Sequence, residues 1–73
     1  MKKHPLQVWA ETNGYSKVDV GEMLGVSRQC VHRWYCGLTT PRTDMLVLID
    51  GSTRGDVSID GMVRWSSQFG KSP

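Results

Sequence analysis

Helix start and stop signals recur along this chain at short intervals, which restricts it to brief helices joined by tight turns. Ser16, followed by Asp19 three residues later, resembles a capping box that opens one helix. Gly25 ends that helix, and Ser27 is a favourable N-cap for the next helix, which runs to a C-terminal stop at Gly37. Two short helices separated by a glycine turn are therefore predicted in the middle of the chain.

Comparable signals place helices on both sides of this pair. A first apolar segment ends at Asn13-Gly14, which is a turn sequence. Thr40-Pro41 places a capping residue before a proline at the first helical position, so a fourth helix should begin there and cover the apolar run MLVLI. Asp50-Gly51 and the polar segment STRGD should end it, and Ser58 caps a last helix over 58–70.

The predicted fold class is all-α, a compact arrangement of four to five helices. No stretch shows sustained strand alternation, and at most a short extended segment is expected near Val57. A chain of 73 residues has room for one domain, residues 1–73, with a thin core. No apolar run reaches membrane-spanning length, and the start MKKHPLQVWAETNG turns polar too soon for a signal peptide. We therefore expect a cytoplasmic protein without a membrane partner.

The third predicted helix has two chemically different sides. On a wheel of about 100° per residue, four long polar side chains share one side: Arg28, Gln29, His32 and Arg33. Val31 and Trp34 point the opposite way, toward the core. The polar side can face a DNA major groove, where arginine forks onto guanine and glutamine onto adenine, or it can be an ordinary solvated face.

The positive charge is concentrated in the half of the chain that contains this helix. Residues 1–42 carry six basic against three acidic side chains, a balance of +3. Residues 43–73 carry three basic against four acidic side chains, a balance of −1. This asymmetry is a mild indication of a polyanionic partner.

The segment SKVDVGEMLGVSRQCVHRWYCG resembles the helix-turn-helix of Cro/CI-type (XRE-like) repressors, with its core at residues 16–37. Aligning the family's turn on Gly25 places Gly21 where the family usually has alanine, a departure that lowers helix propensity. The family's five apolar positions are filled by Val20, Leu24, Val26, Val31 and Trp34. WYCGLTTP and GDVSIDGM resemble further passages of such proteins, so the resemblance covers roughly residues 6 to 63.

This resemblance implies a role for each matched position. The side chains expected to face the bases of double-stranded DNA are Ser27, Arg28, Gln29, His32 and Arg33. The side chains expected to contact phosphates are Ser16, Lys17, Thr39, Thr40 and Arg42. Arg33 could equally hold a phosphate, and His32 could be a spectator.

The last helix has more apolar surface than a thin core can bury. Met62, Trp65 and Phe69 form one stripe, and Ile59 and Val63 form a second to one side of it. In one interpretation Ile59, Met62 and Val63 complete the core and Trp65 covers it. In the other, which we favour, Met62, Trp65 and Phe69 meet a second subunit, so that 58–70 is a dimerisation element.

The sequence offers no catalytic or metal-binding pattern. Cys30, His32 and Cys36 lie near 200°, 40° and 80° on the wheel and do not converge on one ion. No nucleophile with a base, no glycine-rich phosphate loop and no paired carboxylates are recognisable. We expect no enzyme activity, no cofactor, no metal and no small-molecule ligand, with Cys30 as semi-buried packing and Cys36 as a free thiol near the helix end.

The resemblance implies a small transcriptional repressor of phage or prophage type. It would bind an inverted-repeat operator as a homodimer, with half-sites about one DNA turn apart. One alternative is the antitoxin of a toxin–antitoxin pair, which also binds DNA. Another is a protein-interaction module, such as an antirepressor or a polymerase-binding protein, built on the same scaffold.

Overall fold

The computed structural model describes residues 3–69, with side chains through residue 68. These residues form five helices and no strand. The helices are α1 (Pro5–Thr12), α2 (Lys17–Leu24), α3 (Arg28–Tyr35), α4 (Thr43–Ser52) and α5 (Ile59–Phe69). The all-α prediction is confirmed. The short strand allowed near Val57 is absent from these residues, because Val57 lies in an irregular loop and is buried there.

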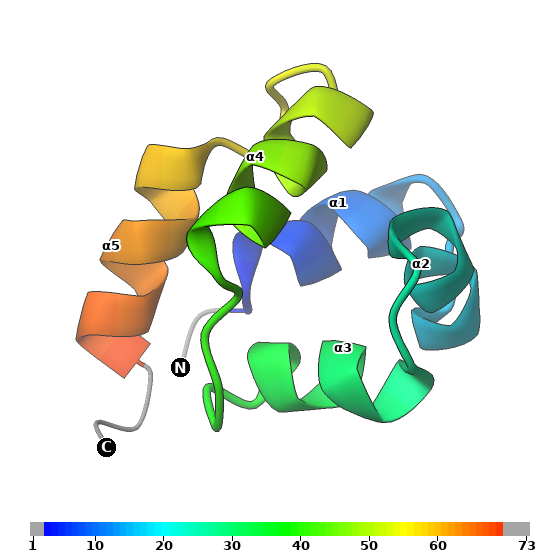
Figure 1. Ribbon diagram of the computed structural model, residues 1–73, viewed down its shortest axis with the longest axis horizontal. Helices are drawn as coiled ribbons and strands as arrows, with labels where there is room; N and C mark the ends of the chain where they lie inside the picture. The colour runs from blue at the N-terminus through cyan, green and yellow to red at the C-terminus, as the bar shows by residue number, and fades with distance from the viewer. Residues whose placement is uncertain (1–2, 70–73) are drawn as a thin grey trace.

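Each helix contributes one side chain to the centre of the core. Leu6, Val20, Val31, Ile49 and Met62 come from α1 to α5 in that order, and none of them is exposed. Burying a side chain of this kind contributes roughly 1.5–3 kcal/mol relative to leaving it in water. The five helices close around this centre with a radius of gyration of 10.9 Å (Figure 1).

The predicted capping signals of α2 and α3 are present. Ser16 Oγ accepts the Asp19 N–H at 3.2 Å, and the Asp19 carboxylate accepts the Ser16 N–H at 3.0 Å, which completes the capping box. Ser27 Oγ accepts the Cys30 N–H at 3.1 Å at the start of α3. Gly25 ends α2 in the left-handed region, with φ of 74°.

The predicted start of the fourth helix is wrong by two residues. Thr40 and Pro41 lie in an irregular segment, and α4 begins at Thr43 with Arg42 as its N-cap residue. Pro41 is buried. The first hydrogen bond of α4, from the Leu46 N–H to the Arg42 carbonyl, begins one residue after it. Packing of the proline side chain against the body of the protein therefore outweighs its preference for a first helical position.

Helix α4 continues through Asp50 and Gly51 and ends at Ser52, the first residue of the STRGD segment that was expected to help end it. The end is set by Thr53, whose side chain is 3% exposed. Its hydroxyl donates to the Ile49 carbonyl at 2.9 Å and accepts the Val57 N–H at 3.1 Å. A single hydroxyl thus closes α4 and holds the loop that leads to α5.

The structure buries two of the three α5 residues of the predicted dimer interface within the single chain. Met62 is fully buried within the single chain and Trp65 is 6% exposed, so neither has appreciable surface left for a second copy. The ring of Trp65 packs edge-on against His4, with centroids 4.8 Å apart. Phe69, the third predicted interface residue, has its side chain outside the described residues. In the alternative interpretation Val63 was expected to lie in the core, but it is 45% exposed.

The N-cap of α1 is a histidine that the sequence analysis did not identify. His4 Nδ1 accepts the Leu6 N–H at 3.1 Å, and the ring is fully buried beside Tyr35 and Trp65. Burial lowers the pKa of His4 from 6.5 to about 4. The ring is therefore neutral at physiological pH and joins the start of the chain to α3 and α5.

Candidate nucleic-acid interface

The turn between α2 and α3 brings two backbone segments unusually close together. A Cβ atom added at Gly21 would lie 2.6 Å from the carbonyl oxygen of Val26, closer than real Cβ contacts. The Val26 N–H donates to the Gly21 carbonyl at 2.9 Å across the same contact. The lack of a Cβ atom at Gly21 is therefore what allows the two segments to approach this closely.

With α3 in this position, the polar side of the helix is exposed, as predicted. Ser27, Arg28, Gln29, His32 and Arg33 are all exposed, while Val31 and Trp34 are buried. Figure 1 shows α3 along one edge of the molecule, with no other described helix beyond it. The five predicted base-facing residues therefore share one accessible face, which we call the α3 face.

One predicted phosphate ligand is joined to this face by a direct contact. Lys17 Nζ lies 3.0 Å from His32 Nδ1. An ammonium group can only donate, so Nδ1 is the acceptor in this contact. Nε2 lies 3.4 Å from Cys36 Sγ, which makes a line of three polar side chains along the face.

The other predicted phosphate ligands occupy two places in the chain. Ser16 precedes α2, and its hydroxyl oxygen and backbone N–H are both engaged in the capping box. Thr39, Thr40 and Arg42 lie in the segment that follows α3, and all three are exposed. The Arg42 side chain makes no hydrogen bond or ion pair within residues 3–69. Its guanidinium is therefore available to an external anion.

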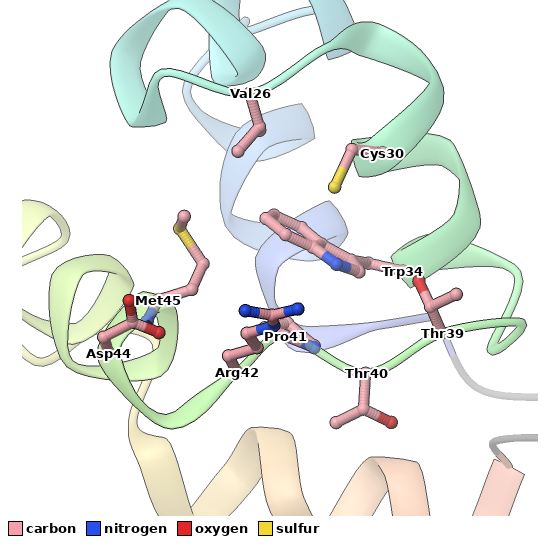
Figure 2. Close-up of a pocket in the computed structure, with 9 residues that line it drawn as sticks. All are labelled: Val26, Cys30, Trp34, Thr39, Thr40, Pro41, Arg42, Asp44 and Met45. Atoms are coloured by element: carbon pink, nitrogen blue, oxygen red, sulfur yellow. Dashed lines mark hydrogen bonds between the residues drawn. The ribbon is translucent and has the colours of Figure 1, made fainter.

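A cavity of about 320 Å³ lies between the inner side of α3 and the start of α4. Its lining residues are Val26, Cys30, Trp34, Thr39, Thr40, Pro41, Arg42, Asp44 and Met45. Figure 2 shows the side chains of Val26, Cys30 and Met45 directed into this space, whereas Thr40 turns away from it. The sequence analysis expected no ligand pocket. The sequence feature that could have indicated the pocket is the placement of Cys30 and Trp34 one turn apart on the same side of the third helix.

The two cysteines lie at different places on α3, Cys30 within the helix and Cys36 at its C-cap. Cys30 packs against the core at the cavity, and Cys36 lies beside His32, so both are half-buried free thiols. Within the described part of the chain, no three potential ligands gather into a metal site. No helix there is long and apolar enough to cross a membrane.

Comparisons with protein-family models, with curated proteins and with solved structures give no match.

Proposed function

We propose that this chain is a sequence-specific, double-stranded DNA-binding transcription regulator with a Cro/CI-like helix-turn-helix. The observation that carries the proposal is the exposed α3 face, whose long polar side chains lie opposite the buried Val31 and Trp34. A helix of this kind fits a major groove, which is about 12 Å wide. The face offers donors and acceptors that match base edges.

Arg28 and Gln29 are the proposed base-reading pair. They occupy the first two positions of α3, and recognition helices contact base edges through their N-terminal residues. Arginine can donate two hydrogen bonds to guanine, and glutamine can pair with adenine through one donor and one acceptor. Ser27 and Arg33 complete the contact at the two ends, with Arg33 able to reach either a base or a phosphate.

Phosphate contacts would fix the register of α3 in the groove. Lys17 extends from the first turn of α2 to the α3 face, where its charge would meet the DNA backbone. The exposed and unpaired Arg42, with Thr39 and Thr40, would hold a second phosphate after α3. These contacts give affinity on any sequence and make it depend on salt.

The proposal includes binding by two copies, one for each half-site of an inverted repeat, so that the protein blocks promoter access as a repressor. Because the single chain buries Met62 and Trp65, we propose that the copies join through another surface. The rival functions, an antitoxin or a protein-interaction module, both require a protein partner. Light scattering on the purified chain would measure whether it self-associates before any partner is added.

Selection of bound sequences from a random duplex library, at near-physiological salt, tests the proposal. The sample must first show a helical spectrum and cooperative unfolding. An enriched motif supports sequence-specific binding, and an inverted repeat with half-site centres about 10 base pairs or a multiple apart supports two copies. No enrichment from folded protein would contradict the proposal and favour the protein-interaction module.

A further inference from the structure

The cavity between α3 and α4 combines an apolar interior with one unpaired positive charge. Val26, Cys30 and Met45 form partly buried apolar walls, and Trp34, only 4% exposed, closes the inner side. Figure 2 shows the Arg42 side chain reaching from the loop toward the same space. A volume of about 320 Å³ is at the lower end of the range for small-molecule sites.

Two charged side chains lie at the cavity rim, the Arg42 guanidinium and the Asp44 carboxylate. The carboxylate of Asp44 accepts the N–H of Met45 at 2.9 Å and so is engaged by its own helix. The Arg42 guanidinium has no partner within residues 3–69, and Arg42 makes no side-chain cap on α4. A guanidinium offers a fork of donors that suits a carboxylate or a sulfonate.

We infer that this cavity is a binding site for a small apolar monoanion, such as an aromatic acid. Its ring system lies against Cys30, Trp34 and Met45, and its acid group pairs with Arg42. Because Arg42 and Thr39 also belong to the proposed phosphate contacts, the bound acid competes with the DNA backbone for the same guanidinium. An acid in the cavity therefore weakens DNA binding. This consequence rests on the proposed function, whereas binding of the acid itself is independent of it.

The binding test uses two fluorescent probes with similar aromatic rings. Anilinonaphthalene sulfonate carries the acid group, and phenylnaphthylamine lacks it. We expect one anilinonaphthalene sulfonate molecule to bind per chain. Arg42→Gln should lower this affinity about tenfold, because it removes one charge-assisted hydrogen-bonding partner of the sulfonate. Arg64→Gln, which removes the same charge from α5, should leave this affinity unchanged, and phenylnaphthylamine binding should be insensitive to Arg42→Gln.

The site is overturned if both probes bind equally well, or if Arg42→Gln leaves the affinity for the sulfonate unchanged. Thermal unfolding of each variant shows that the comparison is between folded proteins. Arg42→Gln should fold normally, because the exposed Arg42 side chain makes no hydrogen bond within residues 3–69.

Alkylation of Cys30 locates the probe. In a Cys36→Ser chain, iodoacetamide can react only with Cys30, which lines the cavity. Saturation with anilinonaphthalene sulfonate should slow this reaction several-fold, and an unchanged rate would place the probe elsewhere and overturn the inference.

The coupling test adds a duplex recovered by sequence selection. The sulfonate should lower DNA affinity, and DNA should lower sulfonate affinity by the same factor. Independent binding of the two would contradict the coupling. If the chain binds the acid and no DNA, the cavity site stands and the proposed function fails.

Discussion

Lys17 Nζ lies 3.0 Å from His32 Nδ1, so the first turn of α2 is joined directly to the exposed side of α3. His32 accepts this contact, and a neutral ring holds the Lys17 ammonium at the edge of the α3 face without cancelling its charge. His32, expected either to face bases or to be a spectator, gains a positioning role for Lys17.

Lys17→Gln should weaken binding to all duplexes by a similar factor. Removing one phosphate contact should also reduce the slope of log affinity against log salt by about 1. Titrations at several salt concentrations measure both effects. Arg64→Gln removes the same charge from α5, where the arginine pairs with Asp60, and should change neither quantity. A change in base preference would show that Lys17 reads sequence instead.

Arg28→Ala and Gln29→Ala should each relax base preference at one position of the site. Each bidentate base contact contributes roughly 1–3 kcal/mol of discrimination. Both side chains are exposed, so neither change should lower the unfolding midpoint. Repeated selection with each variant measures the preference, and an unchanged motif in both variants would remove this pair from the base-reading set.

Gly21→Ala should destabilise the protein by about 1–3 kcal/mol, the usual cost of forcing an atom into a packed site. The new Cβ would lie 2.6 Å from the Val26 carbonyl, and a backbone atom cannot move away cheaply. Gly51→Ala is the matched control, because Gly51 is helical and has no atom within 4 Å of the added Cβ. It should gain roughly 0.5–1 kcal/mol from helix propensity. Urea unfolding compares the two, and equal effects would contradict the steric argument.

Thr53→Val should cost about 1–3 kcal/mol although it nearly preserves side-chain shape. The change removes the acceptor of the buried Val57 N–H. Thr53→Ser keeps the hydroxyl and should lose less. Should valine and serine prove equally destabilising in urea, the methyl group rather than the hydrogen bond would account for the effect.

Acidification should destabilise the fold through His4. Its folded pKa of about 4 is below the unfolded value near 6.5, so the unfolded chain binds the extra proton. Stability from this group is complete above pH 6.5 and falls as pH is lowered toward 4. The full loss is about 3 kcal/mol. Neighbouring Tyr35, whose pKa burial raises to about 12, stays neutral throughout.

Unfolding free energies measured between about pH 7 and pH 4 test this dependence. His4→Asn retains an oxygen that can cap α1 and removes the titrating ring, so its stability should depend less on pH in this window. An equally steep dependence in His4→Asn would assign the effect to other groups.

The sequence predicts the parts of the fold that local chemistry determines. Ser16, Ser27 and Gly25 act through residues only a few positions away, so their patterns are readable without tertiary structure. The start of α4 depends on burial of Pro41 in the assembled protein, and no local pattern contains that information. This error also hid the cavity, because a helix beginning at Pro41 would remove the loop that forms its rim.

The same division applies to the candidate site. Amphipathicity predicts the exposure of Arg28 and Gln29, because α3 has a clear buried side. The Lys17–His32 contact joins residues fifteen positions apart, and it depends on the angle between two helices. The burial of Trp65 depends on the N-terminal His4, whose place in the core no periodicity indicates.

The contact between Gly21 and the Val26 carbonyl has an evolutionary consequence. The angle between α2 and α3 rests on backbone atoms, which substitutions on the α3 face leave unchanged. Arg28, Gln29 and Arg33 can therefore be exchanged with little effect on folding. A lineage carrying this scaffold could acquire new target sequences through a few surface mutations while keeping its architecture.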